Sequence, residues 1–144
     1  MGYCMDLRSA KFQIPADKKA DALAAIKKLA DDVETRGGGG SWGDNGKKES
    51  WYSWVTTSEF VEAKTLYDAM AAWRWYPEED DTGNIVGISF DGEKLGDDTI
   101  LLEAIAPFVQ EGSYIEMQGE DGSYWRWVFE DEGMEEKSGR IVYE

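Results

Sequence analysis

The sequence predicts an α+β fold, and three observations lead to that prediction. Apolar residues recur at three-and-four spacing between residues 17 and 36, as on one face of an amphipathic helix. The last third of the chain alternates apolar and polar residues in runs that Gly-containing turns separate. Between these regions, helical and extended patterns are interspersed. We therefore expect a mostly antiparallel sheet ending in a three-stranded meander, with about three helices packed on one face.

The N-terminal elements are predicted from spacing and from residues that end helices or strands. A first strand is expected to end with residues 11–14, because Pro15 follows it. A helix is expected from an N-cap at Asp17 to about Arg36. Its apolar face comprises Ala22, Leu23, Ile26, Ala30 and Val33. Residues 37–50 are rich in Gly and Ser and are expected to form a flexible loop.

The middle of the chain is predicted to continue with a strand, a helix and another strand. Residues 51–56 are read as a short strand, and residues 58–75 as one long helix. That helix would turn inward Phe60, Leu66, Ala69, Met70 and Trp73. After Pro77, residues 78–81 are expected to form an exposed acidic loop. Residues 85–90 then read as a strand, with one face formed by Val86, Ile88 and Phe90.

The C-terminal third is predicted to contain one helix and the meander. Residues 96–99 are expected to cap the helix, which Pro107 should end or kink near Ala106. Its apolar positions are Ile100, Leu101, Ile105 and Phe108. The three predicted strands are residues 113–118, 124–130 and 140–143. Gly-bearing turn signals separate them at 120–122 and 131–133.

The charge of the chain is unevenly distributed. The net charge is −15. Residues 1–50 contain nine Lys/Arg and eight Asp/Glu, a net of +1, whereas residues 51–144 contain six and 22, a net of −16. Such a surface repels nucleic acid and anionic membranes and attracts basic proteins. The length of 144 residues predicts a single domain, residues 1–144. No apolar run is long enough to predict a transmembrane helix. The single cysteine, Cys4, cannot form an internal disulfide, so a reducing, cytoplasmic compartment is expected.

The residue inventory excludes several kinds of catalytic and metal chemistry. The chain has no histidine and one cysteine, Cys4. Ser-His-Asp catalysis and a Cys/His zinc site are therefore impossible. Gly38, Gly40 and Gly43 match the dinucleotide-binding spacing, but they follow a predicted helix instead of a strand, which favours a plain loop. The acidic segments do not fit the EF-hand pattern, and a looser cation site stays open. We predict no enzymatic activity and no cofactor.

Seven tryptophans form the other unusual feature of the composition. Trp125 and Trp127 lie two residues apart on a predicted strand and so share one face. Together with Phe129 and Trp73, they are expected to build the core. A second group is expected to be exposed and comprises Trp42, Trp51 and Trp75. Trp42 lies in the predicted Gly-rich loop, and Trp75 falls on the outer side of its predicted helix. Exposed tryptophan beside carboxylates is typical of a protein-binding hot spot or a site for cations or sugars.

One stretch of the sequence carries a resemblance to other proteins. It contains Gly-Glu-Asp-Gly at 119–122 and Trp-Arg-Trp-x-Phe at 125–129, with Ile-Val-Tyr at 141–143. Together with the opening Met-Gly-Tyr, it resembles the terminal hairpin of small acidic proteins of bacteriophages and bacterial mobile elements. Most of these proteins are uncharacterised, and the resemblance points to no defined family. It implies a fold and a genomic setting within a bacterial host cell, and no catalytic residues.

These observations predict a non-enzymatic interaction module. Its acidic face would bind a basic surface of a host or defence protein, as a nucleic-acid mimic and inhibitor, without binding nucleic acid or membranes itself. The candidate contacts are Glu78, Glu79, Asp80, Asp81, Asp91, Glu93, Asp97 and Asp98, with Trp42, Trp51 and Trp75. An acidic surface that serves only solubility is the competing interpretation. A second functional hypothesis is a pocket lined by Trp42, Trp51, Trp54 and Trp75 for a nucleotide, sugar or cationic peptide.

Overall fold

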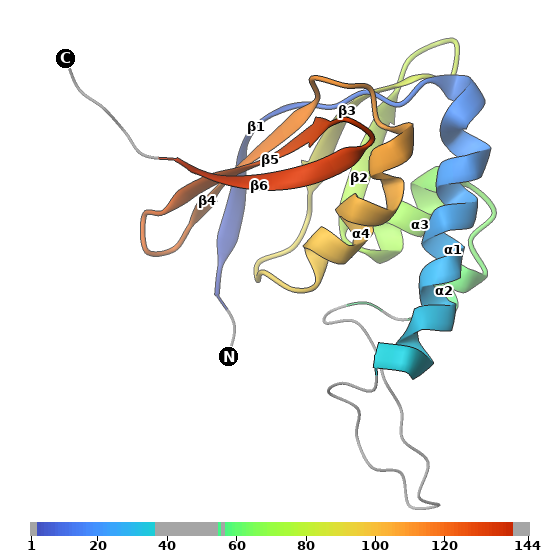
Figure 1. Ribbon diagram of the computed structural model, residues 1–144, viewed down its shortest axis with the longest axis horizontal. Helices are drawn as coiled ribbons and strands as arrows, with labels where there is room; N and C mark the ends of the chain where they lie inside the picture. The colour runs from blue at the N-terminus through green and yellow to red at the C-terminus, as the bar shows by residue number, and fades with distance from the viewer. Residues whose placement is uncertain (1–2, 37–54, 56, 140–144) are drawn as a thin grey trace, which may run out of the picture.

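The computed structural model describes residues 3–36, 55 and 57–139, with side chains described except at residues 31–36 and 57. The predicted loop at 37–50, nearly all of the predicted strand at 51–56 and the predicted strand at 140–143 lie outside the described residues. In chain order, the elements are β1 (Met5–Lys11), the 3-10 turn η1 (Ala16–Lys18), α1 (Lys19–Arg36), α2 (Thr57–Val61), α3 (Leu66–Ala72), β2 (Trp75–Glu79), β3 (Ile85–Phe90), α4 (Asp98–Ile105), the 3-10 turn η2 (Ala106–Phe108), β4 (Tyr114–Gly119), β5 (Tyr124–Glu130) and β6 (Gly133–Gly139) (Figure 1).

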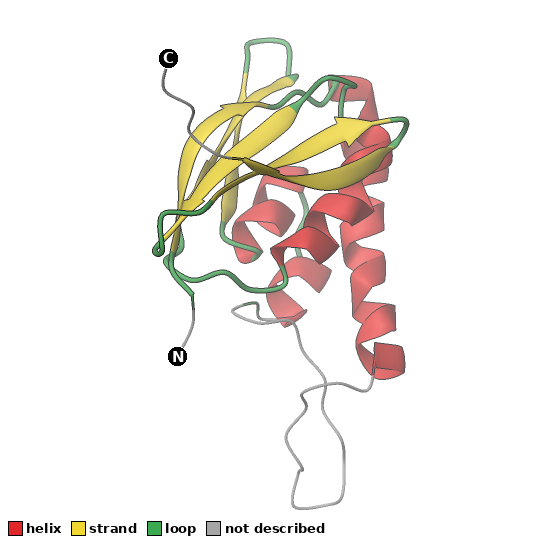
Figure 2. Cartoon of the chain, turned by 60° about the vertical axis from the view of Figure 1, so that its left-hand side comes forward, coloured by secondary structure: helices red, strands yellow, loops and turns green. Residues whose placement is uncertain are grey.

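The fold is α+β, as the sequence predicts. Four antiparallel strands form a sheet in the order β1-β4-β5-β6, and β2 and β3 form a separate two-stranded hairpin. The hairpin approaches β1 through two single antiparallel bridges, which pair Cys4 with Lys94 and Ile14 with Ile85. The helices lie on one side of the sheet (Figure 2). The side chains on the other face are half-buried or exposed, and there Arg126 and Arg8 both approach Glu116, with Nε–O distances of 2.8 Å and 3.6 Å.

The first strand and the first helix agree with the expected pattern in outline. The strand ends at Lys11, three residues before the predicted end, although Ile14 still forms a bridge. Asp17 does not cap α1, because it lies within the 3-10 turn that precedes the helix. Ala22 and Ile26 are buried as predicted, and Leu29, which the predicted apolar face omits, joins them in the core.

The single helix predicted over residues 58–75 is wrong, because the chain forms two short helices and the start of a strand there. The hydroxyl of Thr65 accepts a hydrogen bond from the Asp68 N–H at 3.1 Å, so a new helix begins at Leu66. Arg74 then has φ +75°, a left-handed conformation that ends the helical path and starts β2 at Trp75. The five residues predicted to face inward are nevertheless buried.

The β2–β3 hairpin contains an irregularity that reverses part of its predicted face. Glu78 pairs with Gly87 and Glu79 pairs with Ile85, which leaves Val86 as the extra residue of a bulge. Val86 is therefore 46% exposed, whereas Ile85 is fully buried. The strand at residues 85–90 is confirmed, but Ile85 takes the inward place that the alternation assigned to Val86.

The C-terminal meander is confirmed, with its third strand in a different place. β6 follows β5 after only two residues, Asp131 and Glu132, which have φ of +53° and +62°. Two successive positive φ values are the signature of the tight turn whose twist suits a hairpin. The third strand therefore begins at Gly133, before the predicted segment. Trp127 and Phe129 are buried on one face of β5, and the Trp125 and Trp127 rings are 5.9 Å apart between centroids.

A buried ion pair joins α3, β2 and α4. Arg74 Nη2 donates to both Asp98 carboxylate oxygens, at 3.1 Å and 3.2 Å, and Nη1 donates to the Lys94 carbonyl at 2.7 Å. The Trp75 indole N–H donates to Asp98 at 2.9 Å, and so does the Gly96 N–H. The Asp98 carboxylate is thus surrounded by donors while only 1% of the residue is exposed. Since an unpaired buried charge is costly, each partner depends on the other.

We expect Asp98→Ala to lower the free energy of unfolding by about 3–5 kcal/mol, because it leaves the Arg74 guanidinium uncompensated beside the core. Denaturant unfolding measures the change. Asp81→Ala is the matched control, since Asp81 is exposed in the β2–β3 turn, and it should stay near wild type. Equal stabilities for the two variants would contradict the structural role of Asp98.

Candidate functional site

Two residues predicted as exposed partner contacts are buried instead. Asp98 lies in the ion pair with Arg74, so it is not part of an acidic surface. Trp75 is fully buried, and its ring packs 4.5 Å from Phe90 and 6.0 Å from Trp127 between centroids. The prediction failed for Trp75 because it assumed a continuous helix, whereas the turn at Arg74 places the indole in the core. Trp42, Trp51 and Trp54 lie outside the described residues.

The predicted acidic loop at residues 78–81 is the end of the β2–β3 hairpin. All four side chains are exposed, as predicted, although Glu78 and Glu79 belong to β2. Glu79 forms an ion pair with Lys19, with an Nζ–Oε1 distance of 3.1 Å. Asp80 instead organises the turn, because its carboxylate accepts hydrogen bonds from both Thr82 and Asn84. Glu78 and Asp81 remain as carboxylates that face solvent.

The hydrogen bonds at Asp80 alter its acidity. The Thr82 hydroxyl donates at 2.9 Å, and the backbone N–H groups of Thr82 and Asn84 donate at 2.9 Å and 3.0 Å. These bonds, with the Thr82 side chain first among them, lower the pKa of Asp80 below its ordinary value. Asp80 therefore stays ionised at a pH that protonates ordinary aspartates.

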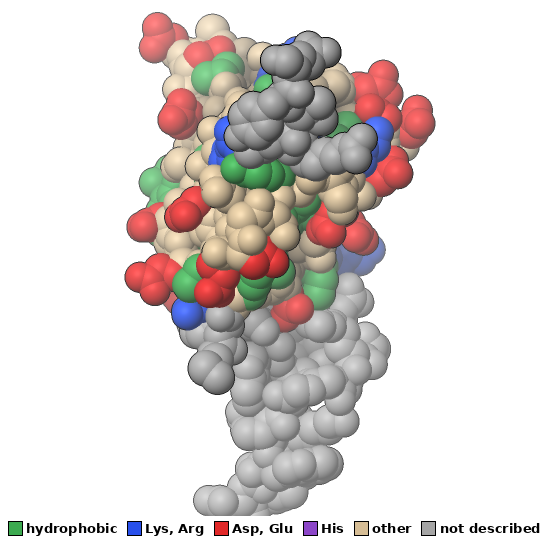
Figure 3. All heavy atoms as spheres, turned by 90° about the vertical axis from the view of Figure 1, so that its left-hand side faces the viewer, with side chains coloured by type: hydrophobic (Ala, Val, Ile, Leu, Met, Phe, Trp, Pro, Cys, Tyr) green, Lys and Arg blue, Asp and Glu red, His purple; other side chains and the backbone are tan. Residues whose placement is uncertain are grey.

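The second predicted acidic segment, residues 91–98, lies at the opposite end of β3. Asp91 and Glu93 are exposed, and Asp97 is half-buried. This segment adjoins the N-terminal residues, since the Met5 N–H donates to the Glu93 carbonyl at 2.9 Å. The two predicted clusters are therefore separated by the length of β3, and the burial of Asp98 leaves the second with fewer charges than expected. On the face drawn in Figure 3, carboxylates are spread around the periphery.

A more concentrated acidic site lies where several turns meet. Figure 1 shows the β2–β3 turn, η1, η2 and the β5–β6 turn at the same end of the molecule. Pro15 introduces η1, and Pro107 lies within η2, so both segments turn tightly. Hydrogen bonds join neighbouring turns. The Ala16 N–H of η1 donates to Asn84 Oδ1 of the β2–β3 turn at 2.8 Å. The Gln110 N–H, after η2, donates to the Gln13 carbonyl, before η1, at 2.8 Å.

Residues of η1 and η2, with the segment after η2 and the β5–β6 turn, line an open cavity of about 640 Å³. Its apolar lining comes from Pro15, Ala106, Pro107, Phe108, Val109 and Phe129. A neighbouring hollow of about 330 Å³ shares Pro15 and Gln110 with it and extends to Asp80. A third, of about 400 Å³, shares Glu111, Glu130 and Asp131. Because they share lining residues, the three hollows form one surface, which we call the acidic groove.

The charges around the main cavity are predominantly negative. Four carboxylates line it, those of Glu111, Glu130, Asp131 and Glu132, against the single ammonium group of Lys18. Glu111 is held in place by the Asp131 N–H, which donates to Oε1 at 3.1 Å. Among the described residues, no Lys or Arg forms an ion pair with Glu130 or Glu132. The groove therefore combines apolar side chains with carboxylates whose charge is available to a ligand.

The lining of the groove suits a cation that also carries apolar groups. Among the described residues, no three Asp, Glu or Cys side chains converge closely enough to hold a metal. Phe108 is half-buried in η2. A partner with aliphatic and basic groups matches such a surface, because lysine and arginine bury their stems while the charged ends reach carboxylates.

Sequence reasoning missed this site for a definable reason. The prediction selected runs of consecutive acids, whereas Glu111 and Glu130 are far apart in sequence and meet through the β4–β5 pairing and the turn that follows. The Gly112 N–H donates to the Phe129 carbonyl at 3.0 Å, which fixes that contact. The run Glu130-Asp131-Glu132 before Gly133 is a visible signal in the sequence, but the turn prediction for this segment assigns it no binding role.

Comparison with known proteins adds no further assignment. Family models, curated proteins and solved structures give no match to this chain. None of the helices within the described residues has the length and apolar character needed to cross a membrane. Function is therefore inferred from the chemistry of the site itself.

We expect Thr82→Val to raise the pKa of Asp80 toward its ordinary value, because it removes the hydroxyl donor and keeps the side-chain shape. NMR titration of the side-chain carboxyl carbon measures the change. Wild-type protein titrated under the same conditions is the control. An unchanged Asp80 titration would show that the hydroxyl does not hold the carboxylate.

Proposed function

We propose that this protein is a non-enzymatic interaction module that binds a basic segment of a partner protein in the acidic groove. The observation that carries the proposal is the groove itself, whose main cavity is lined by apolar side chains, four carboxylates and one lysine. The partner class we propose is a bacterial nucleic-acid-binding protein, in a host or a defence system, whose basic surface would be occluded in the cytoplasm. By occluding that surface, the protein would act as an inhibitor. Its proposed origin in a phage or mobile element is supported only by the sequence resemblance.

Electrostatics supports a basic partner at two ranges. The net charge of −15 attracts a basic protein before contact, since charged surfaces steer association. At contact, Glu130 and Glu132 offer carboxylates that described lysines and arginines do not neutralise. A segment that binds DNA or RNA phosphates carries the lysines and arginines that such a site would accept.

We expect the double variant Glu130→Lys with Glu132→Lys to bind a basic probe roughly tenfold more weakly than wild type, a loss of about 1.4 kcal/mol. The probe is a fluorescent peptide of about ten residues that alternates lysine and valine, an extended cationic ligand. Fluorescence anisotropy measures affinity at low salt and again at about 0.3 M salt, where screening should weaken wild-type binding.

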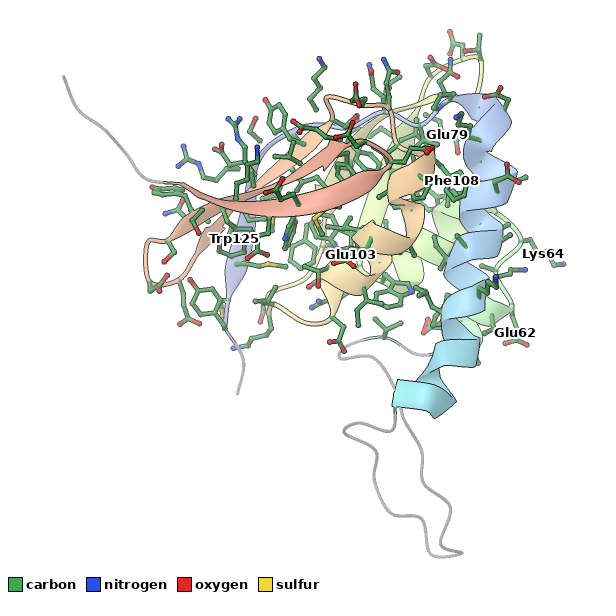
Figure 4. All side chains as sticks on the ribbon, in the orientation of Figure 1. Glu62, Lys64, Glu79, Glu103, Phe108 and Trp125 are labelled. Atoms are coloured by element: carbon green, nitrogen blue, oxygen red, sulfur yellow. The ribbon has the colours of Figure 1, made fainter. Side chains whose placement is uncertain are left out.

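The matched control reverses the same amount of charge elsewhere, with Glu62→Lys and Glu103→Lys. Both residues are exposed and lie away from Phe108 in Figure 4. The control should lose only the long-range attraction and bind more tightly than the groove variant. If both double variants bind alike, the net charge acts without a site, and the groove proposal is wrong.

We also expect no saturable binding to duplex DNA or to single-stranded RNA, because a net charge of −15 repels phosphates. A gel-shift titration at about 0.15 M salt provides the measurement, a condition where specific nucleic-acid binders are saturable. Saturable binding there would contradict the assignment of the protein as a ligand of basic proteins.

A further inference from the structure

The strand β6 is an edge of the described sheet. In the order β1-β4-β5-β6 it pairs on one side only, with β5. The two-residue turn at Asp131 and Glu132 closes on the pair Glu130–Gly133, which in such a hairpin exchanges both backbone hydrogen bonds. Hydrogen-bonded and non-hydrogen-bonded pairs then alternate along the strand.

This alternation identifies the backbone groups of β6 that point away from β5. Glu135 and Lys137 continue the hydrogen-bonded series, so Met134, Glu136 and Ser138 direct their N–H and C=O groups outward. Among the described residues, no backbone hydrogen bond reaches these outward groups. Residues 135–139 are also exposed, and Met134 is half-buried. The edge therefore offers three residues of free backbone to an added strand.

The side chains around this edge show which kind of strand fits it. Residues 130–136 include five carboxylates, and Lys137 is the one basic residue of β6. One of the five, Glu136, accepts a hydrogen bond from the Trp127 indole N–H at 2.7 Å, so its position is fixed. A second copy of this chain would bring the same acids against them, and like charges on neighbouring strands are unfavourable. A basic strand is complementary.

We propose that the partner's basic segment binds as an added antiparallel or parallel strand along β6. Main-chain hydrogen bonds to Met134, Glu136 and Ser138 would supply affinity, and the flanking carboxylates would select lysine and arginine. At the Gly133 end, the same segment reaches Asp131 and Glu132, which line the acidic groove. This inference rests on the proposed function for the charge of the partner, and it adds the binding mode.

The experiment compares Ser138→Pro with Ser138→Ala, using the lysine–valine peptide of the preceding section. Both variants lose the hydroxyl, but only proline removes the outward N–H, and proline at such an edge position leaves the ladder with β5 in place. Wild type and Ser138→Ala should bind the peptide with equal affinity. Ser138→Pro should bind it roughly tenfold more weakly, which corresponds to a loss of about 1.4 kcal/mol in binding free energy. Thermal melting checks that both variants fold.

Amide hydrogen exchange in the wild-type protein gives a second, variant-free measurement. Saturating peptide should slow exchange at Met134, Glu136 and Ser138, whereas Glu135 and Lys137 are already protected by β5. Equal affinity of the two Ser138 variants, or unchanged exchange at the three outward amides, would overturn strand addition. If the Glu130/Glu132 variant still binds weakly in that case, the proposed function stands with another docking mode. Failure of wild type to bind the peptide contradicts both proposals.

Discussion

Asp98 accepts hydrogen bonds from Arg74, Trp75 and Gly96, and the positions of three elements depend on this one buried carboxylate. Arg74 follows α3, Trp75 begins β2, and Asp98 is the first residue of α4. Arg74 also donates to the Lys94 carbonyl and stacks over the Phe90 ring at 5.1 Å from its centroid. The contacts together hold the loop between β3 and α4 against the end of α3.

The same cluster explains how a non-glycine residue keeps a left-handed backbone. A residue such as Arg74 at φ +75° carries a conformational cost of about 1–3 kcal/mol. The guanidinium contacts offset that cost, because they form only when the chain turns sharply after Trp73. Gly92 belongs to the same packing, since a Cβ there would lie 2.6 Å from Phe90 Cζ and 3.0 Å from Arg74 Nη1. The left-handed turn at Arg74 also places Trp75 between Phe90 and Trp127, in the middle of the core.

The parts of the fold that were predictable are those where local spacing and burial agree. The helix at 19–36, the strands at 85–90 and 124–130 and the burial of Trp73, Trp127 and Phe129 all follow from periodicity. The errors arise where a distant partner decides the conformation. Nothing near Arg74 signals its left-handed turn, because the partner is Asp98, 24 residues later. The bulge at Val86 likewise depends on pairing with Glu79, and the acidic groove depends on segments that meet only in the fold.

The carboxylates of this protein differ in what they contact, and that difference matters more than their number. Asp98 balances a buried arginine, Asp80 organises a turn, and Glu79 pairs with Lys19. Each is committed within the molecule, although all three belong to the segments that the charge pattern singled out. Glu130 and Glu132 have no such ion pair among the described residues, and they line a cavity that also presents apolar side chains. A carboxylate that forms an ion pair within the protein loses hydration, and its charge is neutralised by its partner. A carboxylate without such a partner can attract a basic group on another molecule. The acidic residues near the β5–β6 turn are therefore better candidates for binding a partner than the longer acidic runs. They lie beside the open edge of β6, so an extended basic segment could contact both their carboxylates and the free backbone groups of that strand.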